Sequence, residues 1–217
     1  GTKITGTGRH SAVFKSPLTG AWGEASVGGS WGRELKKAGY DGIVIRGRAD
    51  KPCYLWIEDN AVEFRDAASV WGKDTYETDE ALRRETHSQA VVSCIGPAGE
   101  NLALIAGIFT DGSEGRTAAR CGVGAVQGSK NLKAVVVHGK GTTSVFDGAG
   151  LEKNLKSFLP DFVTKTGGLK NFGTAGLVLG CEQTGDFPVK NWQLGQWEEG
   201  AAKISGPAMK EKKKKKN

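Results

Sequence analysis

The chain has 217 residues, a length that allows one or two domains with a buried core. Hydrophobic residues make up 38% and charged residues 25%, which is ordinary for a soluble protein, whereas the 33 glycines are about twice the usual share. The net charge is +6, but segment 210–217 carries six lysines and one glutamate, a net +5, which leaves +1 for residues 1–209. Because a nucleic-acid-binding protein carries its basic patch on the fold, this distribution argues against nucleic-acid binding.

Membrane proteins and disulfide-rich proteins are also disfavoured. The sequence has no apolar run of about 18 residues and no recognisable signal peptide, so we expect a cytoplasmic protein with no membrane partner. The cysteines show neither the C-x-x-C spacing of a zinc or redox motif nor the pattern of a disulfide scaffold. We expect reduced, mostly buried thiols at Cys53, Cys94, Cys121 and Cys181.

The predicted elements begin with strands and tight turns. An alternating segment passes through Gly28-Gly29 into a helix at about 31–38, and the β-branched run 43–45 is predicted to be a buried strand. Segment 53–67 is predicted to form a hairpin around an Asp-Asn pair, which tolerates left-handed turn geometry.

The next predicted element is a helix over 74–87. Asp74 is suited to cap it, Glu77 stands at the capping-box position, and Glu80 can pair with Arg84 one turn later. These local signals reinforce one another, so they favour a well-defined helix start.

Three more strands are predicted, at 89–96, 102–110 and 132–139. Segment 139–150 has the composition of a linker, and helical spacing follows it.

The sequence therefore predicts an α+β chain divided near 142–147. The first domain, 1–142, is expected to be rich in β-strands. Segment 143–209 is expected to be the start of a helical second domain, since about 70 residues form little core alone. The lysine-rich tail 210–217 is expected to be disordered.

The segment "RTAARCGVGAVQGSKNLKAVVVHG" (116–139) invites comparison with known phosphate-binding loops. Its glycines at 122, 124 and 128 have G-x-G-x-x-x-G spacing and do not follow a predicted strand, unlike the dinucleotide fingerprint. The P-loop needs four residues between its glycines and Lys before Ser or Thr, which this segment also lacks. Both nucleotide interpretations fail.

The same segment still contains the components of an anion site. Arg116 and Arg120 are four residues apart, so both can lie on one face if the segment is helical. Small residues beside them let the backbone approach a ligand, and arginine binds phosphate bidentately. A second such segment contains Arg9, Ser26, Gly28, Gly29 and Ser30. Taken singly, each segment can equally be a turn with surface arginines.

Taken together, several long stretches resemble the N-terminal part of the aldehyde ferredoxin oxidoreductase family, in the family's order. They are "GRHSAVFKSPLTG" (8–20), "GRELKKAGYDGIVIRGRADKP" (32–52), "IGPAGEN" (95–101), "RTAARCGVGAVQGSKNLKAVVV" (116–137) and "FPVKNWQLG" (187–195). The resemblance covers almost all of residues 1–209.

This resemblance implies an enzyme that carries tungsten, or molybdenum, on a bis-pyranopterin beside a [4Fe–4S] cluster. Such enzymes oxidise aldehydes to carboxylic acids and pass electrons to ferredoxin. It also implies an N-terminal domain of two β-sheets that form a base for the pterins, with magnesium bridging the pterin phosphates.

The resemblance also implies the site residues. Arg9 matches a cofactor-contacting arginine, and Arg116 and Arg120 match the two arginines of a glycine-rich family loop. Ser26 stands where the family commonly has asparagine near the magnesium, and Cys121 replaces a glycine. The cofactor-binding residues that we predict are Arg9, Ser26, Gly28, Gly29, Arg116, Thr117, Ala118, Ala119, Arg120 and Gly122. No catalytic residue and no metal ligand is predicted in this chain.

The cluster cysteines and later domains of the family have no counterpart here, so we expect this chain alone to be inactive. The implied partners are ferredoxin, a small aldehyde and the remaining domains or a complementary chain, and a homo-oligomer stays open. Two alternatives also stay open: a non-catalytic fragment or pterin-binding subunit, and a family relative that acts on an aromatic thioester.

Overall fold

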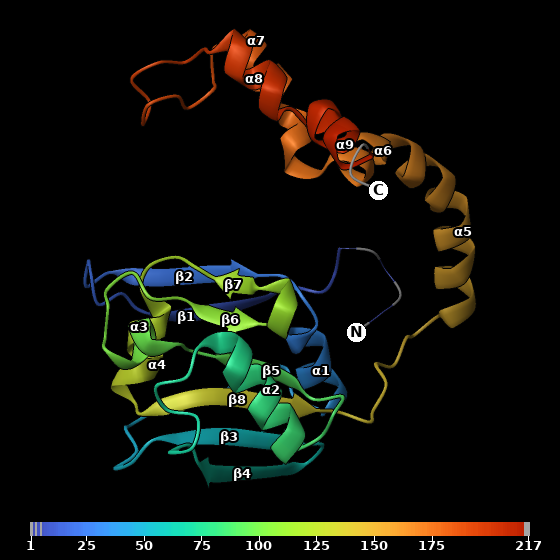
Figure 1. Ribbon diagram of the computed structural model, residues 1–217. Helices are drawn as coiled ribbons and strands as arrows, with labels where there is room; N and C mark the ends of the chain where they lie inside the picture. The colour runs from blue at the N-terminus through green and yellow to red at the C-terminus, as the bar shows by residue number, and fades with distance from the viewer. Residues whose placement is uncertain (1, 3, 5, 215–217) are drawn as a thin grey trace. The chain divides into compact units, whose positions relative to one another are not determined.

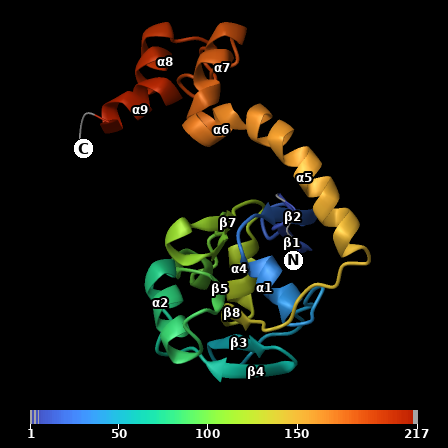
Figure 2. The same cartoon turned by 90° about the vertical axis from the view of Figure 1, so that its right-hand side faces the viewer.

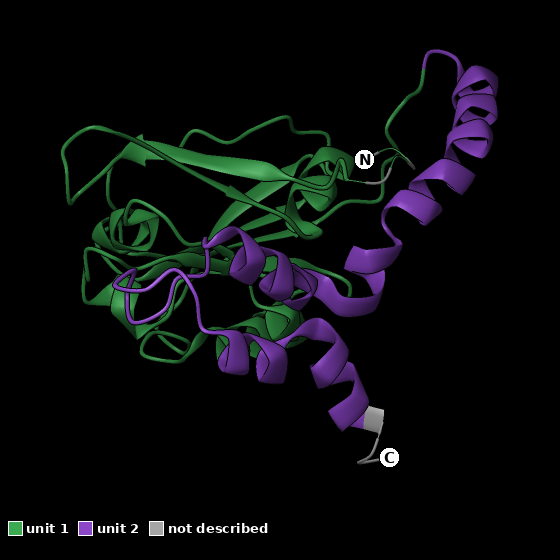
Figure 3. Cartoon of the chain, turned by 90° about the horizontal axis from the view of Figure 1, so that it is seen from above, with its two compact units in different colours: residues 1–145 green, residues 146–217 purple. Residues whose placement is uncertain are grey.

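The computed structural model describes residues 2, 4 and 6–214, the side chain of Lys214 excepted. The chain divides into two compact units, residues 1–145 and residues 146–217, which are coloured separately in Figure 3.

The first unit is built on a mixed six-stranded sheet (Figure 1). Its strand order is β4-β3-β8-β5-β6-β7, and all neighbours are antiparallel except β3 and β8. The strands are β3 (Cys53–Glu58), β4 (Ala61–Asp66), β5 (Val91–Cys94), β6 (Ile108–Thr110), β7 (Arg116–Ala118) and β8 (Leu132–His138).

Helices cover both faces of this sheet, α1 (Trp31–Lys37) on one face and α2 (Thr75–Glu85) on the other (Figure 2). Successive side chains of a strand point to opposite faces. Tyr54 and Trp56 of β3 accordingly belong to the core beside Leu82 of α2, whereas Leu55 and Ile57 belong to the core beside α1. The central strands are therefore apolar at nearly every position.

A separate two-stranded sheet is formed by β1 (His10–Lys15) and β2 (Trp22–Val27), which pair antiparallel. One face of this pair is buried in a third core cluster, which contains Ala25, Val27, Ala118 and Val123. The remaining short elements of the unit are α3 (Pro97–Glu100), the 3₁₀ turn η1 (Gly112–Glu114) and α4 (Val123–Ser129).

Two local predictions are confirmed in detail. β3 and β4 form a hairpin in which Glu58 lies opposite Ala61, so its turn is the Asp-Asn pair, with Asp59 at φ 47°. Asp74 caps α2 through a capping box with Glu77.

Two strand predictions are wrong in part. Residues 43–45 form no strand and Val44 is 82% exposed, because no neighbouring strand pairs with them among the described residues. Within 102–110 only Ile108–Thr110 is extended, because Leu102 has φ 59° and the residues after it form turns.

The second unit is helical. Its elements are α5 (Gly148–Lys165), α6 (Gly167–Phe172), the 3₁₀ helix η2 (Gly173–Leu177), α7 (Val178–Thr184), α8 (Glu198–Ile204) and α9 (Gly206–Lys214). Residues 210–214 continue α9 rather than being disordered as expected, since lysine is a good helix former. The rest of the predicted tail, 215–217, lies outside the described residues.

The predicted α+β class, with a strand-rich first part in two sheets followed by helices, is confirmed. In the described part of the chain, no helix combines the length and apolar character needed to cross a membrane.

Candidate functional site

The exposed face of the β1–β2 pair carries the first predicted arginine. Arg9 precedes β1, and its Nε donates to Ser26 Oγ and its Nη2 to the Ser26 carbonyl, both at 3.2 Å. A Cβ added at Gly28 would lie 3.4 Å from the third nitrogen, Nη1. Glycine at position 28 therefore leaves this side of the guanidinium open, while Ser26 holds the group in place.

The turn after β2 brings Gly29 and Ser30 close to Asp111 and Arg116. Gly29 has φ +100°, and a Cβ there would overlap the carboxylate of Asp111 and lie 3.1 Å from Cγ of Arg116. Ser30 fixes the approach, because its backbone N–H donates to Asp111 Oδ1 at 2.8 Å and its hydroxyl donates to the same oxygen. Only glycine fits this position, since the backbone is left-handed and the space is already filled.

Arg116 is the first residue of β7 and is exposed. Its only ion pair among the described residues joins Nη2 to Glu114 Oε2 at 3.5 Å, and both side chains are more than half exposed. Such a surface pair contributes little to stability. The guanidinium of Arg116 is therefore available to an anion.

The helix considered for 116–120 does not form. Residues 116–118 form β7, so Arg116 and Arg120 do not lie one helical turn apart. The helix face that the two arginines would share to bind one phosphate is therefore not formed. Arg120 and Ala119 follow the strand and are exposed, while the Thr117 hydroxyl donates to the Gly115 carbonyl at 2.9 Å.

Two predicted residues point into the protein. Ala118 is 1% exposed and belongs to the core under β2. Gly122 has φ +80° and is buried, and a Cβ there would overlap the carbonyl oxygen of Leu104. Their small size is explained by internal packing.

The structure thus brings together one group of predicted residues and leaves the rest apart. Arg9 is hydrogen-bonded to Ser26 and lies beside Gly28, and the next residue in the chain, Gly29, lies beside Arg116. We refer to these five residues as the arginine surface.

Asp111 is the residue of this region that the sequence analysis missed. It is left-handed at φ 63°, accepts from Ser30 and from the Thr110 hydroxyl at 2.8 Å, and adjoins Gly29. The Asp-Gly pair at 111–112, a strong turn signal after a strand, could have drawn attention to it. Burial raises the pKa of neighbouring Asp79; Arg83 opposes this rise and Asp111 adds to it.

The cysteines differ from expectation. All four are free thiols, but of these only Cys94 is buried, and burial raises its pKa to about 12. Cys121 is exposed, with φ 63°, and its thiol lies against β2, where it donates to the Glu24 carbonyl at 3.9 Å. Within the described ranges, no three His, Cys, Asp or Glu side chains form a group that could hold a metal ion.

Comparison with protein families gives two matches along the chain. The model described as "Aldehyde ferredoxin oxidoreductase, N-terminal domain" matches residues 1–139. The model described as "Aldehyde ferredoxin oxidoreductase, domains 2 & 3" matches residues 151–217.

Curated relatives agree with these matches. The tungsten-containing aldehyde ferredoxin oxidoreductase of Pyrococcus furiosus is 45% identical and that of Thermococcus kodakarensis 42% identical, over 96% of this chain and 35% of each relative. The chain therefore spans about a third of the length of these relatives. The "Aliphatic sulfonate oxidoreductase, WOR-like subunit" of P. furiosus is 35% identical over 85% of this chain and 32% of its own length.

A solved structure shares the fold. It is described as "Active site complex BamBC of Benzoyl Coenzyme A reductase in complex with 1,5 Dienoyl-CoA". The similarity has a TM-score of 0.69 and 38% sequence identity, and it covers 74% of this chain and 25% of that one.

Proposed function

The chain belongs to the aldehyde ferredoxin oxidoreductase family, and from this premise we propose that residues 1–142 hold the phosphate groups of a tungsten bis-pyranopterin cofactor. The whole protein, in this proposal, oxidises a small aldehyde to a carboxylic acid with ferredoxin as electron acceptor. The cofactor supplies the redox chemistry when bound, and the residues described here bind and orient it.

The observation that carries this proposal is the guanidinium of Arg9, which is held in place while one of its nitrogens has no hydrogen-bond partner among the described residues. Two of its nitrogens are bound to Ser26, which restricts the side chain before any ligand arrives. Nη1 faces the position where Gly28 has no side chain. A positioned cation with a free donor is suited to a phosphate oxygen, because guanidinium–phosphate hydrogen bonds are charge-assisted.

Arg116 extends the same surface. Because Gly29 has no side chain, the Arg116 side chain can approach the end of β2. The exposed ion pair of Arg116 with Glu114 is weak enough to be exchanged for a phosphate. Arg120 lies beyond the end of β7 and, in this proposal, meets a different anionic group. A cofactor with two separate pterin phosphates offers such spaced anions.

Ser26 is the proposed neighbour of the bridging magnesium. Magnesium prefers oxygen ligands, and Ser26 offers its carbonyl and hydroxyl oxygens, both of which accept from Arg9. The carbonyl oxygen has two lone pairs, so it can bind magnesium and keep the Nη2 hydrogen bond of Arg9.

A second candidate function is the reduction of an aromatic thioester. The solved benzoyl coenzyme A reductase complex is 38% identical to this chain and has the same fold, which favours this alternative over unrelated chemistries. Both functions need the same phosphate-binding surface, so the arginine surface does not decide between them. A non-catalytic pterin-binding subunit is the third possibility.

The test is metal and pterin analysis of the protein purified without oxygen from its native source. We expect tungsten with about two pterins per metal. Variants Arg9→Gln and Arg116→Gln should each lose about 1.5–3 kcal/mol of cofactor binding, the usual contribution of a charged hydrogen bond. The control is Arg46→Gln, because Arg46 is exposed and lies outside this surface.

Normal tungsten and pterin content in both site variants would contradict the assignment of the arginine surface. Turnover of an aldehyde, of an aromatic thioester or of neither then separates the three candidate functions.

A further inference from the structure

The six-stranded sheet has two edge strands, and only one of them belongs to the site described above. β7, which contains Arg116, is one edge, and β4 is the other, with four strands between them (Figure 1). In the described part of the chain, no strand pairs with the outer side of β4. Proteins block such an edge with prolines, bulges, charges or covering segments, because it is a template for pairing with another chain. β4 has no proline and pairs with β3 without a bulge, so its charges decide what can pair with it.

The hydrogen bonds of β3 fix which backbone groups of β4 point outward. The N–H groups of Cys53 and Asp59 donate to carbonyl oxygens at or next to the ends of β8. Because hydrogen-bonding directions alternate along a strand, the even-numbered residues of β3 bond to β4, and their partners are the odd-numbered residues of β4. The backbone groups of Val62, Phe64 and Asp66 therefore point away from the sheet. None of them makes a backbone hydrogen bond within the described residues.

The two faces of β4 carry different side chains. Glu63 and Arg65 are on one face, where Arg65 Nη2 lies 2.7 Å from Glu63 Oε2. Val62 and Phe64 are on the other face and are 48% and 73% exposed. The edge thus offers one pair of opposite charges and two uncovered apolar side chains.

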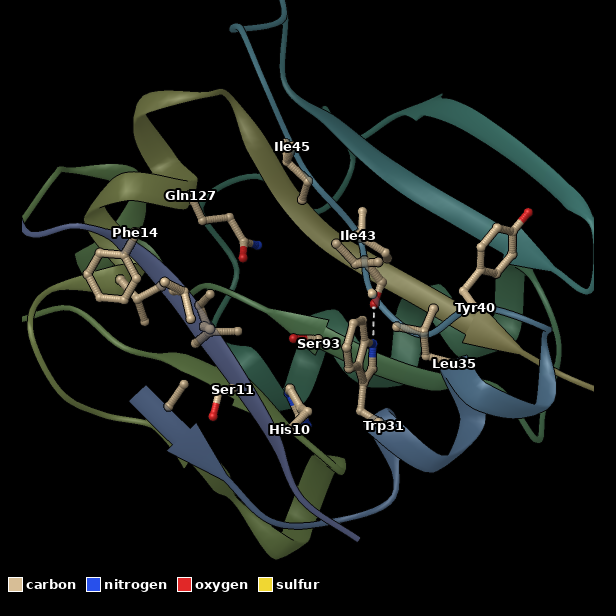
Figure 4. Close-up of a pocket in the computed structure, with 18 of the residues that line it drawn as sticks. His10, Ser11, Phe14, Trp31, Leu35, Tyr40, Ile43, Ile45, Ser93 and Gln127 are labelled. Atoms are coloured by element: carbon tan, nitrogen blue, oxygen red, sulfur yellow. Dashed lines mark hydrogen bonds between the residues drawn. The ribbon is translucent and has the colours of Figure 1, made fainter. Parts of the chain in front are cut away.

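The apolar cover of this second face ends at β3. Tyr40 and Ile43 pack against the cluster that contains the β3 residues opposite Val62 and Phe64. Both also line a cavity of about 840 Å³ beside Trp31 (Figure 4). Neither Val62 nor Phe64 belongs to this cluster or lines this cavity. These two side chains are therefore free to meet an apolar surface that the described residues do not supply.

Two copies of β4 related by a two-fold axis can pair antiparallel along this edge, and the charges distinguish the registers. Pairing centred on Glu63 sets two carboxylates opposite each other, and pairing centred on Arg65 does the same with two guanidinium groups. Like charges at opposite positions are destabilising. Pairing centred on Phe64 instead sets Glu63 of each copy opposite Arg65 of the other. In this register Phe64 faces Phe64 and Val62 faces Asp66, so the outward backbone groups of all three residues are paired.

We propose that β4 pairs antiparallel with β4 of a second copy of this chain, in the register centred on Phe64. The backbone hydrogen bonds supply the attraction, as in strand addition at other sheet edges, and the crossed pairs of Glu63 with Arg65 select the register. The two exposed Phe64 rings then lie opposite each other, an arrangement that stabilises strand pairs. No residue of the arginine surface takes part, so this inference stands or falls separately from the proposed cofactor binding.

The experiment is sedimentation equilibrium of the 217-residue chain under reducing conditions, which keep the exposed Cys121 from linking two chains. We expect a monomer–dimer equilibrium. Glu63→Arg should weaken the dimer at least about tenfold, because like charges then face each other at both symmetry-related positions, and Arg65→Glu should act similarly. The matched controls are Glu80→Arg and Arg84→Glu, which alter the exposed ion pair of α2 and should leave the dimer unchanged.

Mixing the two β4 variants tests the contact between copies directly. The Glu63→Arg chain has two positive charges at these positions and the Arg65→Glu chain has two negative ones. An equal mixture should therefore form a heterodimer at least about tenfold tighter than either variant alone. The chain that carries both substitutions should recover dimerisation to within about threefold, since opposite charges face each other again.

Hydrogen exchange gives a second measurement that needs no variant. A peptide covering 61–66 should exchange more slowly as the chain concentration rises, because the outward N–H groups become bonded in the dimer. Peptides covering β7, the opposite edge, should not change.

A chain that stays monomeric at every concentration reached would overturn the proposal. A dimer that both single substitutions leave unchanged would place the contact elsewhere, for example on the exposed apolar residues of α5, and would overturn it as well. Weakened dimers that form no heterodimer on mixing would contradict the register centred on Phe64.

Discussion

The two compact units differ in how they bury apolar side chains. Among the described residues, the fully buried hydrophobic side chains belong to the first unit, Ala201 excepted. The second unit instead exposes large apolar residues, and α5 alone has Phe158, Leu159 and Val163 at 52–58% exposure. The sheet unit therefore supplies its own core, whereas the helices of the second unit depend on surfaces that they do not provide themselves, since isolated helices are marginal in water.

The comparison extends to charged groups. Lys133 of β8 is fully buried, and its Nζ donates to the Lys73 carbonyl at 2.8 Å and to the carboxylate of Glu100, which is itself almost fully buried. In the second unit, Lys203 pairs with Glu199 on α8, and both side chains are mostly exposed. The two ion pairs have the same chemistry in opposite environments.

The largest expected effect is that of breaking the buried pair. Lys133→Met should lower the free energy of unfolding of the first unit by roughly 3–5 kcal/mol, because it leaves the Glu100 carboxylate buried without its cation. Lys203→Met should cost less than about 1 kcal/mol. Urea unfolding measures the total, and hydrogen exchange of peptides from each unit locates the loss.

A loss below about 1 kcal/mol for Lys133→Met would show that Glu100 finds other partners or takes up a proton. The double variant Lys133→Met, Glu100→Met should recover most of the lost stability, since no charge then remains unpaired.

A smaller effect is expected from adding one methyl group to a glycine in each unit. Gly29→Ala should destabilise the first unit by about 1–3 kcal/mol, because the residue has φ +100° and its Cβ would overlap Asp111. Gly180→Ala should stabilise α7 by about 0.5–1 kcal/mol, since no atom lies within 4 Å of its Cβ position and alanine is the better helix former. Thermal unfolding should show a lower melting temperature for Gly29→Ala and a higher one for Gly180→Ala. A change in the same direction in both variants would contradict this difference between the units.

The smallest expected change in stability is at the exposed surface of α5. Phe158→Ser should alter the free energy of unfolding by no more than about 0.5 kcal/mol, because the ring is 58% exposed and its one ring contact among the described residues is Phe162, four residues on. Self-association, followed by light scattering, should decrease, since large exposed apolar patches promote association. A destabilisation above about 1 kcal/mol would show that Phe158 is packed rather than exposed.

Secondary structure was predicted most accurately where it depends only on residues close together in the sequence. The capping box of Asp74 with Glu77 and the two-residue turn after Glu58 are set by side chains and backbone within a few positions. The predicted strand at 43–45 failed because a strand also needs a hydrogen-bonding partner, and local composition cannot supply one.

The candidate site shows the same difference between features set by nearby residues and features that depend on distant segments. The sequence picked out Arg9 and Arg116 by residue type and by family resemblance, and the structure places both on an exposed surface. It could not show that Ala118 and Gly122 are buried, or that Asp111 occupies the space beside Gly29, because these facts depend on contacts between distant segments.

The sequence by itself thus determined the α+β class, the family and the residues that are chemically able to bind an anion. Composition, periodicity and motif order are properties of the chain and need no folded context. Only the tertiary structure decided that Ser26 holds Arg9, that Gly29 admits Arg116, and that a cavity forms beside Trp31. These features arise from close packing of segments up to about a hundred residues apart, where exclusion of overlapping atoms selects one arrangement.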